Sequence, residues 1–541
     1  MSKEFKSKID VQSESFLKNR AEMLKKIKEM RNLEKRSFNA SESKRKKFED
    51  RNQLTPRERL NALIDPDSEF IELYNMAGFL VEDNNPETSI PGASVIAGIG
   101  FIKGVRCMIM VDDSGINAGA ATSTTVDKCV GCLEISLEKK LPFVHLVESA
   151  GINLMNYKVE IWARAGGMFA GLAKLSAAGV PTITILHGLS TAGGAYNVGM
   201  SDYVIGVKKN GMAALAGPAL LKAATNEVAS NKELGGSEMH ATVSGLVEYL
   251  AEDDSDAIDI ARNVVNALDW NSGFSTIKDN DYIEPKYDID EIAGIVNLDY
   301  KKPYDAREII LRLVDDSSFI EFKPRYGITT LCFQADINGN SCGIIANNGP
   351  IDTDGATKSE QFFKICNKSN IPIIILNKDT GIMIGKKYEQ AGMIKHGSKM
   401  IQAVTNITVP KISLYVGASF GAGNYGMCGY AYDPDFLLSW PNAVTGVMGG
   451  QQAASTMAQV MVAAAKKRGD SFDQEQIDQK QKEISKHFDN QSSAFYTSGR
   501  LLDMGIIDPR ETRKVLAFLL QTCKESKARK LKSNTFGIAR M

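Results

Sequence analysis

Residues 409–429 read VPKISLYVGASFGAGNYGMCG, and this stretch decides the fold of the chain. Its apolar run from Ile412 to Val416 is short, rich in β-branched residues and bounded by Pro410 and Gly417, which is typical of a buried strand. The residues that follow are small: Gly417, Ala418, Ser419, Gly421, Ala422 and Gly423. A strand that ends this way leaves backbone N–H groups free to point at a ligand. A tight strand-to-helix turn without chemistry is the alternative interpretation.

The same layout occurs at residues 180–200, VPTITILHGLSTAGGAYNVGM, which favours a functional interpretation. Five pairs match at an offset of 229 residues: Val180 and Val409, Pro181 and Pro410, Gly188 and Gly417, Ser190 and Ser419, Gly194 and Gly423. LPFVHLVESAG (141–151) likewise matches IPIIILNKDTG (371–381) at 230, and residues 56–73 match 305–322 at about 250. This repeat predicts two copies of one α/β unit, each ending a strand in a small-residue turn.

Length and composition agree with two domains. A chain of 541 residues is too long for one core, and its net charge of −1 gives no general affinity for nucleic acid. No apolar run reaches 18 residues, so no membrane span is expected. Eight cysteines in so long a chain do not suggest a disulfide framework and favour a reducing compartment.

The expected domains are an N-terminal amphipathic helical segment (1–50), an N-terminal domain (51–290) and a C-terminal domain (291–541). Apolar residues at helical spacing form one stripe in the first segment: Phe16, Met23, Leu24, Ile27 and Met30. The polar stretch 271–303 is expected to be a linker, and the Gln/Lys-rich stretch 463–500 one extended helix.

Backbone donors at two small-residue turns suit a developing oxyanion, and each such donor is worth about 3 kcal/mol in a transition state. The candidates are the amides of Gly193 and Gly194 in one half and of Ala422 and Gly423 in the other.

Side-chain catalysts are scarce in the sequence. None of the five histidines lies beside a Ser or Cys nucleophile motif, and His145 and His187 fall within apolar strands, where core histidines are expected. Cys129 and Cys132 form a single CxxC without a second pair, so no metal site is expected. Neither a P-loop nor a GxGxxG after a strand is present.

Eight motifs together resemble the carboxyltransferase (β) subunit of biotin-dependent acyl-CoA carboxylases. They are LTPRERLNALIDPDSEF (54–70), STAGGAYNVGMSD (190–202), LAGPALLKAAT (215–225), ELGGSEMHATVSGLVEYLAEDD (233–254), YEQAGMIKHGSKMI (388–401), GASFGAGNYGMCGYAYDPDFLLSWPNA (417–443), VMGGQQAA (447–454) and TFGIARM (535–541). The stretch 421–436 and the closing 535–541 look most like the methylcrotonoyl-CoA carboxylase branch, which also holds geranoyl-CoA carboxylases.

The resemblance implies an α/β fold of two tandem crotonase-like (ClpP/crotonase superfamily) domains related by internal duplication, with acyl-CoA bound mainly by the first and biotin by the second. It implies oxyanion holes at Gly193/Gly194 and Ala422/Gly423, and cofactor-binding positions at Gly151, Gly381, Gly421 and Asn424. No protein base is needed, because carboxybiotin loses CO₂ and the biotin enolate removes the acyl-CoA proton.

The resemblance also implies partners. Carboxybiotin is carried on a biotin carboxylase/biotin carboxyl carrier subunit, and the chain forms a homo-oligomer, a hexamer in which the dimer is the active-site unit. The compartment is the cytoplasm of a bacterium or the mitochondrial matrix of a eukaryote. Nucleic acid and membranes are not expected partners.

Departures from the family pattern bear on the acyl group. A Thr-Val-Lys-Gly-Gly-Thr run is replaced by GINAGAAT (115–122), where Asn117 takes the place of Lys, a Gly-Gly-Ala-Asn run reads AGIN (150–153), and Gly-Pro-Pro reads Gly217-Pro218-Ala219. The expected substrate is 3-methylcrotonoyl-CoA, with propionyl-CoA, geranoyl-CoA or another acyl-CoA as alternatives.

Other functions compete with this one. A crotonase-type hydratase or hydrolase would need an acidic pair, but Glu148 and Asp379 lie in different halves. A biotin-dependent decarboxylase subunit keeps the fold and changes the reaction. A catalytically inactive scaffold would be favoured by bulky residues at the turns, which are small.

Overall fold

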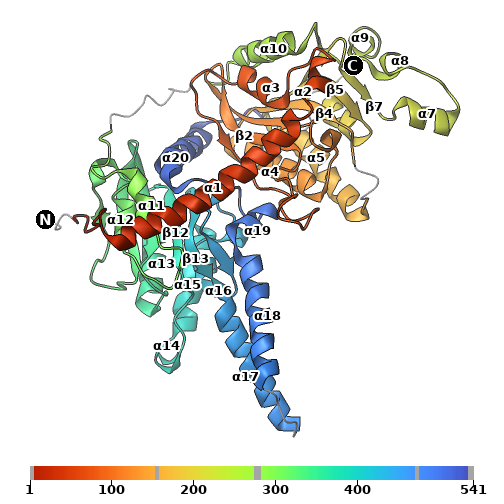
Figure 1. Ribbon diagram of the computed structural model, residues 1–541. Coiled ribbons are helices and arrows are strands. Elements are labelled where there is room, and N and C mark those ends of the chain that lie inside the picture. Colours follow the sequence, from red (N-terminus) through yellow and green to blue (C-terminus); the bar gives the residue numbers. More distant parts are fainter. Residues whose placement is uncertain (1–4, 153–156, 273–281, 469–473, 534–541) are drawn as a thin grey trace. The chain divides into compact units, whose positions relative to one another are not determined.

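The computed structural model describes residues 5–152, 157–272, 282–468 and 474–533. The chain divides into two compact units (Figure 1). The N-terminal unit comprises Arg31–Lys278, Gly499–Leu501 and Thr522–Met541, and the C-terminal unit comprises Met1–Met30, Asp279–Ser498 and Leu502–Gln521. Helices α1 (Glu14–Glu42) and α20 (Thr512–Ala528) therefore contribute residues to both units.

The N-terminal unit is built around one mixed sheet with helices in its crossover connections. Its strands are β1 (Ile71–Glu72), β2 (Val95–Ile102), β3 (Val105–Asp112), β4 (Phe143–Ser149), β5 (Thr182–Thr191), β6 (Tyr203–Val207), β7 (Met212–Ala214) and β8 (Tyr249–Ala251). Its helices are α2 (Arg45–Glu49), α3 (Pro56–Leu63), α4 (Ser123–Lys139), α5 (Val159–Ala178), α6 (Gly193–Gly199), α7 (Pro218–Thr225), α8 (Asn231–Gly235), α9 (Ser237–Met239) and α10 (Asp254–Ala267), with short turns η1 (Asn117–Gly119) and η3 (His240–Ser244).

The strand order in this sheet is β1-β2-β3-β4-β5-β6-β8, and β7 pairs with β5. β1, β2 and β3 are antiparallel, whereas β3, β4, β5, β6 and β8 are parallel. Parallel strands are covered on both faces, which explains their nearly continuous apolar runs. The core joins strand residues such as Ile109 and Val144 to Ile258 and Val265 of α10.

The C-terminal unit repeats this plan. Its strands are β9 (Ile320–Glu321), β10 (Thr330–Ile337), β11 (Asn340–Asn347), β12 (Ile373–Asp379), β13 (Lys411–Phe420), β14 (Phe436–Ser439) and β15 (Val444–Gly446). Its helices are α11 (Ile292–Ile295), α12 (Ala306–Ile310), α13 (Thr353–Lys368), α14 (Lys386–Gln390), α15 (Met393–Asn406), α16 (Gly421–Gly426), α17 (Gly450–Arg468), α18 (Gln474–Ser492) and α19 (Ala494–Gly499), with η4 (Ile289–Glu291), η5 (Asp315–Ser317), η6 (Tyr430–Tyr432) and η7 (Pro509–Glu511).

The sheet of the C-terminal unit has the order β14-β13-β12-β11-β10-β9, with β15 paired to β13. β9, β10 and β11 are antiparallel, and β11 to β14 are parallel. Phe362 and Phe363 of α13 pack with Met400 of α15 and with Ile373 and Ile375 of β12 in one apolar cluster.

Both sheets carry the same irregularity next to the small-residue turn. The register of β4 and β5 shifts between Val147 and Ser149, so that Ser149 faces Ser190. The register of β12 and β13 shifts between Asn377 and Asp379, so that Asp379 faces Ser419. A bulge at this point redirects the chain after the strand, and its recurrence places the two turns at equivalent positions in their sheets.

The apolar stripe of the first 50 residues is confirmed, because Phe16, Met23, Ile27 and Met30 of α1 are buried. Phe16 lies so close to Gly294 that a Cβ there would approach its ring to 2.3 Å. This contact corrects the expectation of an irregular linker over 271–303: η4 and α11 form helical turns there, and α11 is buried against α1. Residues 273–281 of that stretch lie outside the described residues.

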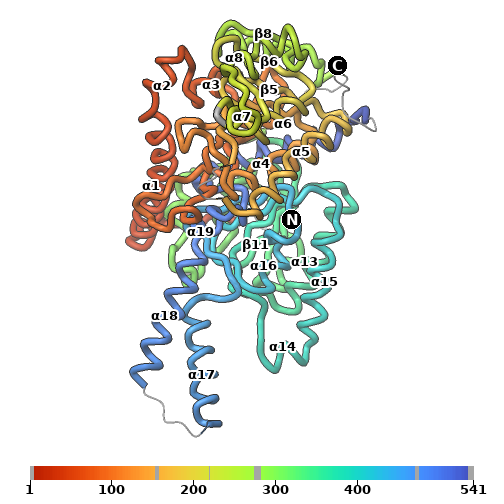
Figure 2. The backbone as a smooth tube through the Cα atoms, turned by 90° about the vertical axis from the view of Figure 1, so that its right-hand side faces the viewer, coloured from red at the N-terminus to blue at the C-terminus, as the bar shows by residue number. Residues whose placement is uncertain are grey.

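The prediction of one extended helix over 463–500 is wrong. The structure has two helices, α17 and α18, which lie side by side as a projecting arm of the C-terminal unit (Figures 1 and 2). Residues 469–473 between them lie outside the described residues, as does the closing motif 535–541. Their sequence, GDSFD, has the composition of a turn, which a long polar helix would not contain.

Candidate active site

The turn of the N-terminal unit begins where β5 ends and α6 starts. Gly193 and Gly194 are the first residues of α6, and the first N–H groups of a helix have no acceptor within it. Neither amide donates to another backbone group in the part of the chain that the structure describes. The two N–H groups are therefore available to a ligand oxygen.

The backbone is bent at Ala192 to present these amides. Ala192 has φ 55° and ψ −122°, a region that residues with a Cβ rarely adopt, and its N–H donates to Ala214 O of β7 at 3.0 Å. A Cβ on Gly194 would lie 2.7 Å from Ser190 Oγ. The turn thus combines local strain with a close approach that only glycine permits, as functional sites often do.

The turn of the C-terminal unit repeats this geometry with a glycine at the bend. Gly421 has φ 55° and stands at the repeat position of Ala192. Ala422 and Gly423 follow it in the first turn of α16, and their amides have no backbone acceptor within the described ranges. A Cβ on Gly423 would lie 1.9 Å from Asp379 Oδ1, so this position has no room for a side chain.

Gly151 and Gly381 lie beside the two turns, but their amides are already engaged. Gly151 N–H donates to Ser149 Oγ at 3.2 Å, and Gly381 N–H donates to Asp379 Oδ1 at 3.0 Å. Each glycine has a positive φ and lies close to the strand end that precedes its turn, near Thr191 O or Phe420 O. In this arrangement they shape the wall of the turn.

Asn424 holds α16 against β13. Its Nδ2 donates to Ser419 Oγ at 2.9 Å and to Tyr415 Oη at 3.1 Å. Ser419 Oγ in turn donates to Asn377 Oδ1 at 3.1 Å or to Asp379 Oδ2 at 3.4 Å. The Asn424 side chain therefore faces the protein and positions the turn.

Asp379 is the titratable group nearest to the C-terminal turn. It is fully buried, and burial raises its pKa to about 7, although bonds from Gly381 and Ser419 favour the ionised form. The carboxyl therefore changes charge near neutral pH, directly beneath Gly423.

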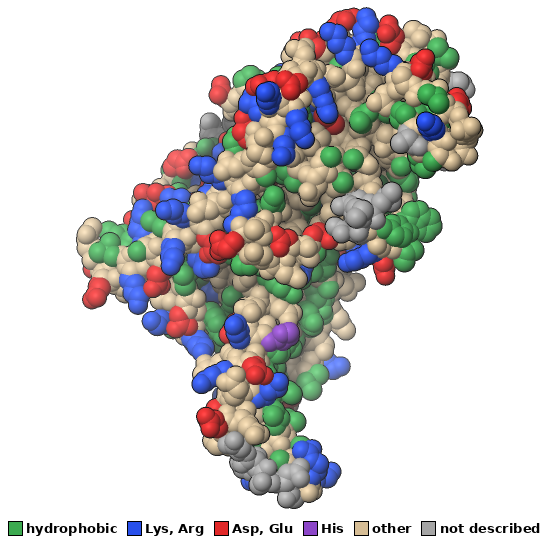
Figure 3. All heavy atoms as spheres, turned by 45° about the vertical axis from the view of Figure 1, so that its right-hand side comes forward, with side chains coloured by type: hydrophobic (Ala, Val, Ile, Leu, Met, Phe, Trp, Pro, Cys, Tyr) green, Lys and Arg blue, Asp and Glu red, His purple; other side chains and the backbone are tan. Residues whose placement is uncertain are grey.

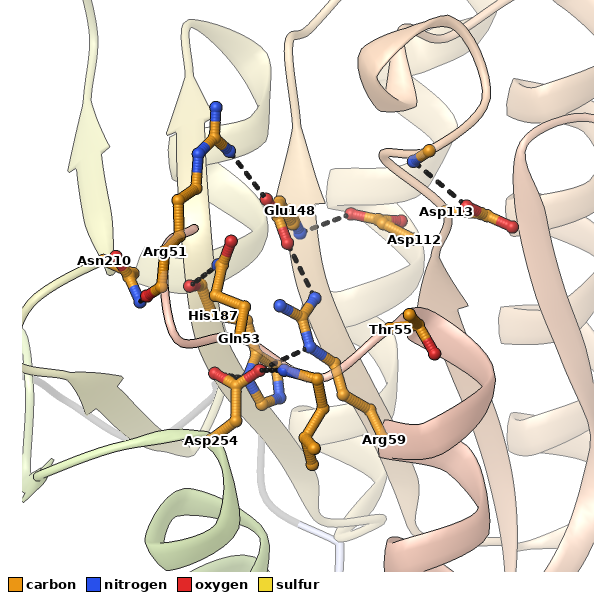
Figure 4. Close-up of polar contacts among 12 residues, drawn as sticks. Arg51, Gln53, Thr55, Arg59, Asp112, Asp113, Glu148, His187, Asn210 and Asp254 are labelled. Carbon is orange, nitrogen blue, oxygen red and sulfur yellow. Dashed lines mark hydrogen bonds and ion pairs between the residues drawn. The ribbon is translucent and has the colours of Figure 1, made fainter. Parts of the chain in front are cut away.

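A buried ionic network lies under the N-terminal turn (Figure 4). Arg59 of α3 joins two carboxylates: its Nη1 lies 2.7 Å from Glu148 Oε2 and its Nε lies 2.8 Å from Asp254 Oδ2. Asp254 Oδ1 lies 2.9 Å from His187 Nδ1. Burial alone would raise the pKa of Asp254, but His187 and Arg59 outweigh it and lower this pKa to about 2.

His187 is kept neutral within this network. Burial and the nearby Arg59 guanidinium lower its pKa, and its side chain is completely buried. A Cβ on the next residue, Gly188, would lie 2.5 Å from Glu148 Cδ. The network thus fixes the ends of β4 and β5, from which the turn departs.

Comparison with known proteins decides the family. The carboxyl transferase domain model matches residues 47–537. The chain belongs to the carboxyl transferase family. The prediction of a carboxyltransferase is confirmed, and the two turns are those of an enzyme of this kind.

Relatives match this carboxyltransferase over nearly its whole length. A probable biotin-dependent acyl-coenzyme A carboxylase beta2 subunit of Mycobacterium tuberculosis is 44% identical over 91% of this chain and 91% of its own. A methylcrotonoyl-CoA carboxylase beta chain of Dictyostelium discoideum is 40% identical over 98% of this chain and 90% of its own. The crystal structure of the geranyl-CoA carboxylase beta subunit of P. aeruginosa superposes with a TM-score of 0.92, at 43% identity, covering 99% of this chain and 100% of that one.

The sequence motifs outside the turns have structural roles in this carboxyltransferase. His145 Nε2 lies 3.0 Å from Asp112 Oδ1 in the core, and Cys129 and Cys132 are buried thiols. In the described ranges no three His, Cys, Asp or Glu side chains lie together as a metal site requires. No helix there combines the length and apolar character needed to cross a membrane.

Two of the departing segments lie side by side, which sequence reasoning missed. Ala121 N–H donates to Gly151 O at 2.8 Å, and Ala150 N–H donates to Ala118 O at 3.2 Å. Both segments adjoin Ser149, which faces Ser190 at the foot of the N-terminal turn. Asn117 itself is exposed, and Asn153 lies outside the described residues.

Proposed function

We propose that this enzyme carboxylates 3-methylcrotonoyl-CoA, with the carboxyl group donated by carboxybiotin on a partner subunit. The observation that carries the proposal is the pair of equivalent turns, each with two unpartnered amides and no room for a Cβ at Gly194 or Gly423. It is supported by relatives whose names specify methylcrotonoyl-CoA and geranyl-CoA carboxylases and which match the chain almost from end to end. Both named acyl groups are branched, α,β-unsaturated thioesters.

In the proposed mechanism the chain supplies electrostatic stabilisation. The amides of Gly193 and Gly194 bind the thioester oxygen and stabilise the negative charge that develops when the substrate enolate forms. The amides of Ala422 and Gly423 bind the ureido oxygen of biotin. Carboxybiotin supplies CO₂ and, once the carboxyl group has left, the base. Gly151, Gly381, Gly421 and Asn424 hold the two turns in shape.

We further propose that two copies of the chain build each site. Large apolar side chains are exposed around both turns: Leu189, Tyr196 and Leu215 in the N-terminal unit, and Ile384, Tyr425 and Val447 in the C-terminal unit. Figure 3 shows one face on which hydrophobic side chains gather between charged ones. Such patches are typical of protein interfaces. The dimer would be the active-site unit of a hexamer, completed by a biotin carboxylase/biotin carboxyl carrier subunit.

The proposed architecture is a pair of crotonase-like domains, 51–290 and 291–541, that arose by duplication after the segment 1–50. Matching details support it beyond the sheet order. Arg57 pairs with Glu72 at 2.7 Å, as Arg307 pairs with Glu321 at 2.6 Å. The hairpin turns before β3 and β11 are each bound by an aspartate, Asp65 or Asp315. The proposed compartment is the bacterial cytoplasm, or the mitochondrial matrix in a eukaryote.

The substrate proposal predicts a preference among acyl-CoAs. With its biotin-carrying partner, the enzyme should have a kcat/KM for 3-methylcrotonoyl-CoA at least about tenfold above that for propionyl-CoA, because one or two methylene-sized differences in an apolar pocket discriminate by about 1–3 kcal/mol. Initial rates of acyl-CoA-dependent carboxylation measure both values. A higher kcat/KM for propionyl-CoA would reject this substrate while leaving carboxyl transfer intact.

A further inference from the structure

A cavity of about 370 Å³ lies at the ends of β12 and β13 in the C-terminal unit. Three lysines line it, Lys301, Lys302 and Lys378, and no aspartate or glutamate is among its lining residues. Gly417 and Ala418 of β13 form part of its wall. The cavity therefore suits a negatively charged group.

Lys378 enters this cavity without a counter-ion. Among the described residues its Nζ forms no ion pair; it donates to the backbone carbonyls of Tyr304 and Asn347, the latter at 3.5 Å. Nζ also lies 3.8 Å from the centroid of the Tyr304 ring. Burial lowers the pKa of Lys378 to about 8, against a smaller opposing effect of Asp305. At pH 7.5 about a quarter of such an amine is neutral, against about one part in a thousand for an ordinary lysine.

Two other polar atoms of the cavity wall are unsatisfied. Tyr304 Oη and Asn442 Oδ1 are buried and have no hydrogen-bond partner within the described residues. Burial raises the pKa of Tyr304, so its hydroxyl keeps its proton and remains a donor without an acceptor. An anion next to Lys378 would supply that acceptor.

The repeat indicates which charge belongs at this position. Lys378 stands at the repeat position of Glu148, 230 residues earlier. Both side chains lie beneath a glycine of the next strand: a Cβ would meet Glu148 Cδ at 2.5 Å from Gly188, and Lys378 Cγ at 3.4 Å from Gly417. In the N-terminal unit this place holds a carboxylate. In the C-terminal unit it holds an amine that one addition reaction would turn into a carboxylate.

We propose that Lys378 reacts with CO₂ to form a carbamate that occupies this cavity. The Nζ lone pair attacks the carbon of CO₂, an N–C bond forms as one C=O π bond becomes a C–O⁻ bond, and one N–H proton leaves to water. The remaining N–H stays on the Tyr304 carbonyl, and the long contact with Asn347 O is given up. Tyr304 Oη–H donates to a carbamate oxygen, while Lys301 and Lys302 balance its charge. Dissolved CO₂ suffices, so the inference stands whether or not the proposed substrate is right.

Carbon-13 NMR of the full chain in ¹³C-bicarbonate buffer at pH 8 tests the proposal. We expect a carbamate carbon resonance that grows with CO₂ and falls below pH 7 as the amine is protonated. K378R, which keeps the charge but has no nucleophilic amine, should lose it at least tenfold. Y304F, which keeps the ring and removes only the hydroxyl, should weaken it severalfold at equal CO₂.

The matched control is K358R, because Lys358 is also a buried lysine whose pKa burial lowers, but it does not line the cavity. K358R should keep the resonance. Trapping the wild-type carbamate by O-alkylation, followed by peptide mapping, should place the added mass on residue 378 without any variant. A resonance that survives in K378R, its absence from the wild type, or a trapped mass on another residue would overturn the proposal.

Discussion

Replacing Gly423 by valine should abolish carboxyl transfer while leaving the assembly intact. The first atom of any side chain there would lie 1.9 Å from Asp379 Oδ1, so the turn would have to move away from β12. The variant would lose an oxyanion donor worth about 3 kcal/mol and would also obstruct the approach of biotin. We expect kcat/KM to fall by at least about a hundredfold. Steady-state carboxylation with the partner subunit measures it.

A matched glycine distinguishes this effect from a general loss of stability. Gly446 ends β15 in the same unit, and a Cβ there would have its nearest neighbour, Met448 O, at 3.9 Å. Gly446→Ala should therefore keep nearly full activity. A Gly423→Val enzyme that folds and retains more than about a tenth of wild-type kcat/KM would show that this turn does not bind the reacting group.

Two inactive variants should restore activity when they are assembled together. Gly194→Val blocks the turn of the N-terminal unit, and Gly423→Val blocks that of the C-terminal unit. If each site uses one turn from each of two copies, a mixed dimer has one site with both lesions and one with neither. Random pairing makes about half of the dimers mixed, so about a quarter of wild-type activity should return.

The control is each variant unfolded and reassembled alone, which should stay inactive. Native mass spectrometry confirms that the mixed assemblies have formed. If the mixture contains mixed assemblies and no activity returns, the two turns serve the same site within one chain, and the proposed shared site is wrong.

Local signals made much of this fold predictable. The strand of residues 412–416 and its repeat are short apolar runs that end in small residues, and the structure has β13 and β5 there. The helix at Pro56 was predicted from a capping box, and Thr55 and Glu58 form both of its hydrogen bonds. In these cases the interactions that decide the structure join residues close together in the sequence.

The details of the site depended on distant contacts. Arg59 joins Glu148 and Asp254, which are 89 and 195 residues away, and no local pattern pairs such residues. The bend at Ala192 was equally hidden, because alanine gives no signal for a positive φ that its repeat partner Gly421 makes obvious. Occupation of the Gly381 amide depends on the orientation of the Asp379 side chain, which only tertiary packing determines.

A single-turnover transfer tests the central claim most directly. The biotin-carrying partner is charged with ¹⁴C-carboxyl groups, freed of ATP and bicarbonate, and mixed with this chain and 3-methylcrotonoyl-CoA. The account predicts that the label moves from biotin to an acid-stable acyl-CoA product, and that Gly423→Val prevents this transfer. Label that stays on biotin, or that leaves as CO₂ without forming a labelled acyl-CoA, would contradict it.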